Sequence, residues 1–354
     1  MTVSVSISLW SVVSAVAVSV LATAAPTSSF PGVQPQLAAV GDRVYLAFGR
    51  ADTISVARSD DGGETFGTPV RLPLAGRLAL GMHRGPRVAA TGSTVLVTAV
   101  AGAKGGGADG DVLLFRSADR GTSWAAPVVV NDVPGSAREG LQALAASPSG
   151  LVVIAWLDLR AAGTRIFAAV SRDHGATWAP DVLAYASPAG SVCECCHPSV
   201  AIDDSGGIAV MFRNHVAGNR DMYVVRSTAD GRFASATKAG TGSWRLNACP
   251  MDGGGLAFDA NGAVTVWRRE NGIFLSSSTV PERRLGTGRD PAIATTGARH
   301  DIAWSAPEGI MLMRDSAPVA AVARGRFPSV LALQDTTILA WEDQGTVLVR
   351  AIPR

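Results

Sequence analysis

The stretch Ser59-Asp60-Asp61-Gly62-Gly63-Glu64-Thr65-Phe66 recurs along the chain, and this repeat decides the fold. Two more complete copies and a shortened fourth copy follow the pattern S-x-D-x-G-x-T/S-aromatic; they comprise Ser117, Asp119, Gly121, Ser123 and Trp124, then Ser171, Asp173, Gly175, Thr177 and Trp178, then Ser227, Asp230, Gly231 and Phe233. The copies stand roughly 55 residues apart, a period typical of propellers and solenoids. An array of similar modules is therefore predicted.

The chemistry of the motif is that of a tight turn. Aspartate oxygens accept hydrogen bonds from turn amides, and glycine adopts the left-handed conformation without a steric penalty. The aromatic ring that ends the motif can pack between neighbouring strands. We therefore expect a structural role, not a catalytic one, for the motif aspartates Asp61, Asp119, Asp173 and Asp230.

The motif resembles the Asp-box, or BNR repeat, of the sialidase superfamily. That resemblance implies an all-β propeller in which each Asp-box forms the turn between the third and fourth strands of a blade. It also implies that these turns lie on the face opposite the active site. The resemblance extends over nearly the whole chain after residue 25.

Seven modules can be counted from their short apolar first strands, each of which begins a repeat. These starts are Gln36 to Ala39, Arg87 to Ala90, Leu141 to Ala145, Ser199 to Ile202, Gly255 to Phe258, Ala292 to Ala294 and Ser329 to Ala332. The last module ends after its third strand, so we expect the segment after Pro26 to supply the missing one. Seven blades are favoured, with the six blades of catalytic sialidases as the alternative.

Composition narrows the class of protein. The chain has 354 residues and a net charge of +2, which gives no reason to expect binding to nucleic acid or to an anionic membrane. Residues 1–25 are rich in Ser, Val and Ala and end in small residues before Pro26, as in a cleaved signal peptide. We expect an exported protein, periplasmic or secreted, with one propeller domain over residues 26–354, no membrane span and a monomeric state.

Propeller connectivity gathers most of the unusual polar residues on one face, here called the upper face. It carries the loops that join second to third strands and the loops that lead into each first strand. Arginine grips carboxylates through a planar fork, so an arginine-rich face is suited to an acidic sugar or another anion. The predicted ligand-binding residues are Arg160, Arg213, Asn214, His215, Arg220 and Arg268. The alternative is that each arginine pairs with a neighbouring acid and fastens the loops.

The catalytic set of true sialidases does not transfer to this sequence. No Arg-Ile-Pro motif lies near the start of the mature chain, and none of the three tyrosines falls in the late blade where the family keeps its nucleophile. Hydrolysis by two carboxylates would need a facing pair. The candidates for it are Asp158, Asp221, Asp252, Glu270 and Asp290.

All four cysteines fall in two adjacent entry loops, beside a histidine. The cluster comprises Cys193, Cys195, Cys196, His197 and Cys249. Two disulfides are one interpretation, since the protein is predicted to be exported. A soft-metal site for copper or zinc is another, and a catalytic thiol with His197 or His215 as its base is a third.

Three functions therefore remain open. The first is a sialidase-like protein that binds or acts on glycans or other anions through the upper face. The second is a periplasmic copper or zinc protein built on the cysteine cluster. The third is a non-catalytic interaction scaffold in which the cysteines only staple loops.

Overall fold

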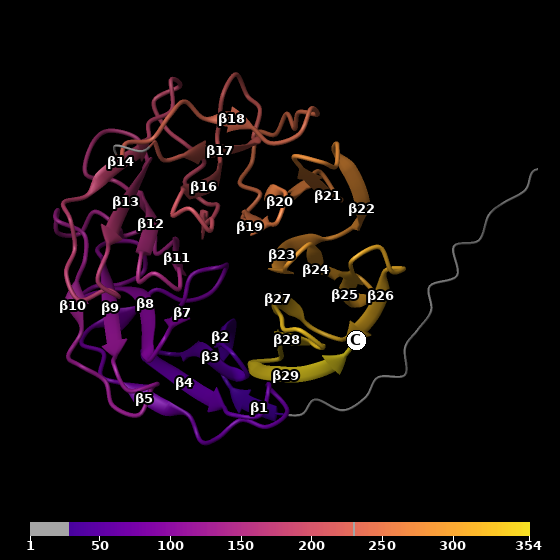
Figure 1. Cartoon of the computed structure of the whole chain (residues 1–354). Helices are drawn as coiled ribbons and strands as arrows, with labels where there is room; N and C mark the ends of the chain where they lie inside the picture. Colours follow the sequence, from indigo (N-terminus) through magenta and orange to yellow (C-terminus); the bar gives the residue numbers. More distant parts are fainter. Residues whose placement is uncertain (1–27, 229–230) are drawn as a thin grey trace, which may run out of the picture.

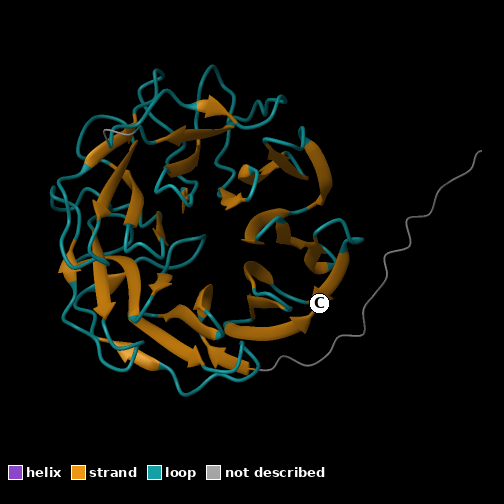
Figure 2. Ribbon diagram, viewed as in Figure 1, coloured by secondary structure: helices purple, strands orange, loops and turns teal. Residues whose placement is uncertain are grey.

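The computed structural model describes residues 28–228 and 231–354. The predicted signal peptide and Asp230 lie outside these residues. The described chain contains 29 β-strands, and none of it is helical (Figure 2). Within this part of the chain, no helix is present that could cross a membrane.

The strands form seven sheets arranged in a ring around a central channel (Figure 1). The innermost strands of blades 1 to 7 are β2 (Val33–Val40), β7 (Arg87–Thr91), β11 (Gln142–Ala146), β15 (Ser199–Ile202), β19 (Gly254–Asp259), β23 (Arg289–Thr296) and β27 (Arg326–Ala332). The second strands are β3 (Arg43–Arg50), β8 (Thr94–Gly102), β12 (Val152–Asp158), β16 (Ile208–Arg213), β20 (Gly262–Arg269), β24 (Arg299–Ala306) and β28 (Thr336–Asp343).

The outer half of each blade continues in the same antiparallel order. The third strands are β4 (Thr53–Ser59), β9 (Asp111–Ser117), β13 (Arg165–Ser171), β17 (Met222–Arg226), β21 (Gly272–Ser277), β25 (Gly309–Arg314) and β29 (Thr346–Pro353). The outermost strands are β5 (Val70–Leu72), β10 (Val128–Val129), β14 (Val182–Tyr185), β18 (Thr237–Lys238), β22 (Arg283–Thr287), β26 (Ala320–Ala323) and, in blade 7, β1 (Ser28–Pro31). An extra strand, β6 (Arg77–Leu78), pairs with β8 in blade 2.

The ring is closed by the two ends of the described chain. Strand β1 pairs antiparallel with β29, in a register that runs from Ser28 opposite Val349 to Pro31 opposite Thr346. Closure leaves only short sheet edges, which limits pairing with other chains. The prediction of seven blades completed by an N-terminal strand is confirmed, and the six-bladed alternative is excluded.

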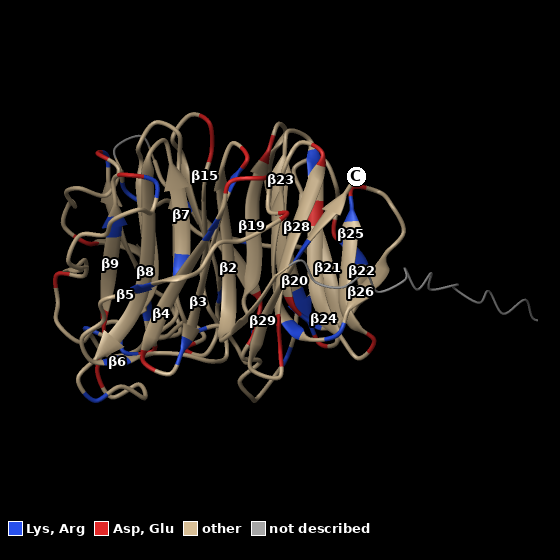
Figure 3. Ribbon diagram, turned by 90° about the horizontal axis from the view of Figure 1, so that it is seen from below, with Lys and Arg blue, Asp and Glu red and all other residues tan. Residues whose placement is uncertain are grey.

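The core consists of apolar layers between neighbouring blades, and strand alternation explains how one strand serves two layers. In β8, Val95, Val97 and Ala99 pack against blade 1, whereas Leu96 and Val100 pack against blade 3. Successive side chains of a strand point to opposite faces, so a fully apolar strand can fill both layers. Each of the seven blade interfaces has such an apolar cluster. In the side view, charged residues lie mainly toward the two ends of the strands (Figure 3).

The motif aspartates accept a repeated set of turn hydrogen bonds. Asp61 accepts from the Ser59 hydroxyl at 2.6 Å, from the Thr65 amide at 2.9 Å and from the Thr65 hydroxyl, while the Gly63 amide donates to Ser59 Oγ at 2.9 Å. The same four bonds recur around Asp119 and Asp173. Hydrogen bonds from Ser59 and Thr65 lower the pKa of Asp61 to about 2. These turns join third to fourth strands on the lower face, the face opposite the upper face.

Candidate functional site

The upper face is built on bulges in three of the innermost strands. Register shifts interrupt β2, β23 and β27 directly before the regular part of each strand. At these points Gln34, Asp290 and Phe327 have φ angles of 57°, 56° and 51°. Each of the three precedes a proline. A bulge re-aims side chains, and the left-handed backbone costs a non-glycine residue about 1–3 kcal/mol, so this geometry is held by the structure around it.

The amide of each bulged residue is held by a side chain of the preceding blade. Asp252 Oδ2 accepts from the Asp290 amide at 3.2 Å, and Ser305 Oγ accepts from the Phe327 amide at 3.1 Å. Glu342 Oε2 accepts from the amide of Gln34 at 3.0 Å. Asp252 and Glu342 are therefore buried acceptors that fasten one blade to the next.

His83 joins Asp290 and His197 at the mouth of the channel. His83 Nε2 lies 2.9 Å from Asp290 Oδ1, and the His83 ring stacks on His197 with centroids 4.3 Å apart. The edge of Phe327 meets the His83 ring at a centroid distance of 4.8 Å. Four entry loops, those of blades 2, 4, 6 and 7, therefore meet at this point.

The two buried carboxylates at this position have different electrostatic environments. Burial and the charge of Asp290 raise the pKa of Asp252. Burial also acts on Asp290, but the hydrogen bond and charge of His83 and the charge of Arg289 outweigh it, and the pKa of Asp290 is lowered. Donor atoms of His83, Asp252 and Asp290 lie within 4.8 Å of one another, close enough to share an ion. Arg268 and Arg289 nearby already supply positive charge.

A cavity of about 640 Å³, here called the arginine cavity, opens on the upper face between the entry loops of blades 5, 6 and 7. Its lining includes Arg268, Arg289, Asp290, Arg326, Met82, Met251 and Phe327. Asp290 also lines the mouth of the central channel, so the two hollows adjoin. The cavity thus combines apolar side chains with three guanidinium groups.

The three arginines of this cavity are paired with carboxylates buried behind them. Nε of Arg326 lies 2.8 Å from Glu342, and Nε of Arg289 lies 3.5 Å from Asp290. The side chains of Arg326 and Arg289 are 67% and 51% exposed, whereas their acids are 3% and 2% exposed. Their terminal nitrogens donate no hydrogen bond within the described residues. Each of these two arginine–carboxylate pairs carries no net charge, but only its positively charged guanidinium group is exposed to a ligand.

Most of the predicted ligand-binding residues hold loops together instead. Arg213 is 1% exposed and donates to the backbone carbonyls of Asp252, Arg220 and Arg268 at 3.1, 2.7 and 3.0 Å. Asn214 is also 1% exposed; its amide donates to the Tyr185 hydroxyl, and its oxygen accepts from the His215 amide. The structure does not bring these side chains into the arginine cavity.

Arg220 and Arg160 lie elsewhere. Arg220 donates to the carbonyl of Leu246 and to Cys193 Sγ. Arg160 binds Asp158, Asp132 and Asp181 in one ion-pair network. Burial and the neighbouring Asp132 raise the pKa of Asp181 to about 6. Among the predicted arginines, Arg268 alone lines the cavity.

The predicted acid candidates separate into one close pair and three isolated groups. Asp252 and Asp290 lie together, as described. Asp158 is 1% exposed and accepts from Trp156 and Arg160. Asp221 accepts from the Trp244 amide and pairs with Lys238, and Glu270 is exposed.

Three of the four cysteines bring their sulfur atoms together, and the fourth lies apart from them. Cys193 Sγ lies 3.5 Å from Cys195 Sγ and 3.4 Å from Cys196 Sγ, and the last two sulfurs are 3.9 Å apart. All four cysteines are free, and Cys249 is exposed. Three of the predicted cluster residues are thus brought together. The exposed Cys249 is not among them, and the His197 ring stacks on His83 instead.

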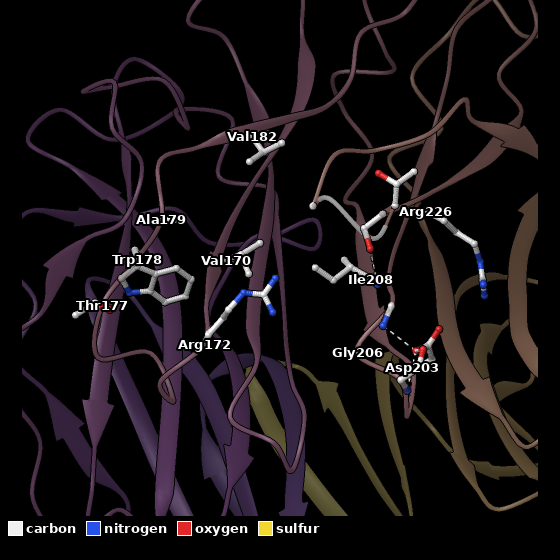
Figure 4. Close-up of a pocket in the computed structure, with 15 residues that line it drawn as sticks. Val170, Arg172, Thr177, Trp178, Ala179, Val182, Asp203, Gly206, Ile208 and Arg226 are labelled. Carbon is white, nitrogen blue, oxygen red and sulfur yellow. Dashed lines mark hydrogen bonds between the residues drawn. The ribbon is translucent and has the colours of Figure 1, made fainter.

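A larger hollow of about 1000 Å³ lies on the lower face, between blades 3 and 4 (Figure 4). Trp178 and Arg172 line it from blade 3, and Asp203 and Arg226 from blade 4. Asp203 there accepts local turn bonds from the amides of Ser205 and Gly207. Because this hollow lies beside the structural turns, whereas the arginine cavity adjoins the channel mouth that His83, His197 and Asp290 line, the arginine cavity is the better candidate site.

The propeller connectivity predicts that His83, Arg289 and Arg326 lie on the upper face but gives them no role, and it does not single out Phe327. The available signal was the x-Pro step that begins several innermost strands, such as Asp290-Pro291 and Phe327-Pro328. Because a bulge there turns the preceding side chain, the residues before these prolines are candidates for the site.

No protein-family model matches this chain. No curated protein sequence matches it either. Solved structures do resemble it in fold. An α-L-arabinanase of Penicillium chrysogenum, complexed with arabinobiose, aligns with a TM-score of 0.57 and 14% identity over 93% of this chain and 96% of that one.

Two other solved propellers give similar values. An ulvan lyase bound to -[GlcA(1-4)Rha3S]- has a TM-score of 0.56 and 11% identity, covering 93% of this chain and 94% of the lyase. The leech intramolecular trans-sialidase, complexed with 2,7-anhydro-Neu5Ac, has a TM-score of 0.52 and 11% identity, covering 91% of this chain and 68% of that one. The chain therefore shares the β-propeller fold of these three enzymes.

Proposed function

We propose that the protein recognises an acidic glycan in the arginine cavity. The observation that carries this proposal is the pair of exposed guanidinium groups, Arg289 and Arg326, whose terminal nitrogens are unused and whose acids are buried. A free guanidinium edge binds a carboxylate or sulfate through two parallel hydrogen bonds. The likeness to propellers that act on glycans supports a sugar as the ligand.

The apolar part of the cavity suits the other half of a sugar. Phe327, Met82 and Met251 all line the cavity, and the Arg326 guanidinium stands over the Phe327 ring at 5.2 Å from its centroid. Glycan sites combine a few fixed polar groups with apolar surface that covers the ring. An exported location, as residues 1–25 predict, would expose this cavity to polymeric glycans.

Recognition rather than two-carboxylate hydrolysis follows from the burial of Asp252. Its side chain is 0% exposed and already accepts from the Asp290 amide. A retaining or inverting hydrolase needs both carboxyl groups in reach of the sugar. Asp290 borders the cavity, but its side chain is 2% exposed and paired with His83 and Arg289, so it holds Arg289 in place.

The test compares ligand charge in a thermal-shift assay. Oligoglucuronate is expected to raise the Tm, because a ligand at 100 times its Kd stabilises the folded state by about 2.7 kcal/mol. Arg289→Ala and Arg326→Ala should remove the shift, and Arg71→Ala, an exposed arginine on β5, should retain it. An equal shift with neutral arabino-oligosaccharide would contradict recognition of an acidic sugar; no shift with any glycan would contradict the proposed function.

A further inference from the structure

The three clustered thiols lie outside the proposed glycan site and have no role in it. Cys193, Cys195 and Cys196 are 1%, 7% and 1% exposed and form an isolated cluster against which Met251 packs. Sulfur separations of 3.4 to 3.9 Å far exceed a disulfide bond of about 2.05 Å. Three sulfur atoms that are not bonded to one another in this structure therefore meet in one buried place.

The entry loop of blade 4 is shaped to bring these thiols together. The Cys193 amide donates to the Arg213 carbonyl at 3.0 Å, which ties the loop to the end of β16. Glu194, between two of the cysteines, is exposed, while the three thiols face inward. The loop thus has its polar residue outside and its sulfur atoms inside.

The size of the sulfur triangle fits a metal ion. An ion bound at the zinc–sulfur distance of about 2.3 Å would stand roughly 1 Å above the plane of a triangle with these sides, which leaves a fourth position open. The partly buried Met251 side chain packs against the cluster, and its thioether is a soft ligand. The three thiols and the thioether beside them therefore form a set of soft donors.

We propose that Cys193, Cys195 and Cys196 bind one Cu(I) ion, with Met251 as the fourth, weaker ligand. Thiolate and thioether donors favour soft ions such as Cu(I) and zinc, and structural zinc sites are completed by a fourth cysteine or a histidine. No such ligand closes this site in the described chain: Cys249 is exposed, and His197 stacks on His83.

One arginine offsets half of the negative charge at the site. Binding of Cu(I) by three thiols releases three protons to solvent and leaves a complex with two negative charges. Arg220 donates from Nη1 to Cys193 Sγ at 3.0 Å, which places one positive charge against it. A buried anionic cluster needs such a partner, since an uncompensated buried charge is strongly destabilising.

The copper site adjoins the arginine cavity without depending on it. Met251 packs against the thiols and also lines the cavity, and Cys196 precedes the channel histidine His197. A bound ion would thus hold in place both Met251, which lines the arginine cavity, and the loop that carries His197. Binding of copper can nevertheless be tested without any glycan, so the two proposals can fail separately.

The experiment titrates the reduced, full-length protein with Cu(I) under anaerobic conditions, against a competing chelator. We expect one ion per chain, protection of three thiols from alkylation and continued labelling of Cys249. Cys195→Ser should abolish binding, and Arg220→Met should weaken it by about 10–100-fold, as loss of an outer partner does. Cys249→Ser should bind as the parent does.

Thermal unfolding separates folding defects from lost ligands. Copper should raise the Tm of the parent and of Cys249→Ser, and leave that of a folded Cys195→Ser unchanged. Three results would overturn the assignment: a purified protein in which these cysteines form disulfides, zinc bound more tightly than Cu(I), or copper binding that survives Cys195→Ser.

Discussion

The imidazole of His83 stacks on that of His197, with centroids 4.3 Å apart and planes inclined by 26°. The contact joins the entry loops of blades 2 and 4 across the channel mouth. Burial, followed by the charge of His83, holds the pKa of His197 well below its usual range. A neutral His197 can face His83 without charge repulsion, which leaves His83 to pair with Asp290.

Replacing the buried carboxyl of Asp252 by a neutral amide is predicted to stabilise the fold, by an amount that depends on pH. Its pKa is raised above that of the unfolded chain by burial and by Asp290, so its ionisation removes stability as the pH rises through the folded pKa. His83, Arg213 and Arg268 face it and only partly offset this. The Asp252→Asn variant keeps an oxygen for the Asp290 amide, and its Tm relative to the parent should be higher at pH 7 than at pH 4.

The control for this comparison is Asp204→Asn, since Asp204 is exposed. Its Tm difference from the parent should be the same at both pH values. A relative Tm of Asp252→Asn that falls as the pH rises would mean that the charged form of Asp252 stabilises the fold.

Arg213 is predicted to act on stability and not on ligand binding. Arg213→Ala leaves three carbonyls without their donor and should lower the free energy of unfolding by about 3 kcal/mol or more. Arg213→Lys should rescue little, because a single ammonium cannot reproduce the planar fork. Urea unfolding measures the change; a parent-like midpoint for Arg213→Ala would show that these bonds contribute nothing.

The motif turn predicts sensitivity to acid. The folded pKa of Asp61 is about 2, below its ordinary value, so its contribution is complete above pH 4 and is lost as the pH falls toward 2. Asp61→Ala should cost about 0.5–2 kcal/mol at pH 7, as loss of a capping acceptor does, and much less near pH 2. Asp42→Ala is the control, because only the backbone carbonyl of Asp42 accepts a turn hydrogen bond. A constant penalty across this range would exclude the charged carboxylate as the cause.

Closure of the ring predicts a large effect from a residue near the start of the described chain. Phe30 on β1 stacks on Phe48 of blade 1 at 5.5 Å and packs into the cluster between blades 7 and 1. Phe30→Ala should destabilise the fold by about 1–3 kcal/mol, less than full burial would give. Ser29→Ala, an exposed change on the same strand, should be neutral. Equal unfolding midpoints for the two variants would contradict a role for β1 packing in closure.

The blade count could be predicted because it depends on local patterns. The turn motif around Asp61, Asp119 and Asp173 fixes a module length, and alternation within strands such as β8 fixes two packing faces. Closure by β1 follows from counting strands. These features need no knowledge of which distant loops touch.

The sequence predicts which face of the propeller carries the site, but not which residues of that face form it. Arg213 and Arg289 both lie at strand ends on the upper face, yet Arg213 is 1% exposed and the side chain of Arg289 is 51% exposed. The difference depends on how loops of neighbouring blades pack over Arg213, which no local pattern records. Contacts between far segments, such as His83 with Asp290, decide the chemistry for the same reason.

The most direct test of the account is isothermal titration calorimetry of the protein with oligoglucuronate and with its carboxyl-reduced, neutral counterpart. We predict measurable binding of the acidic oligosaccharide, which weakens with added salt and is lost in Arg326→Ala, and no binding of the neutral one. Equal affinity for both oligosaccharides, or binding that Arg326→Ala leaves intact, would contradict recognition of an acidic sugar by the arginine cavity.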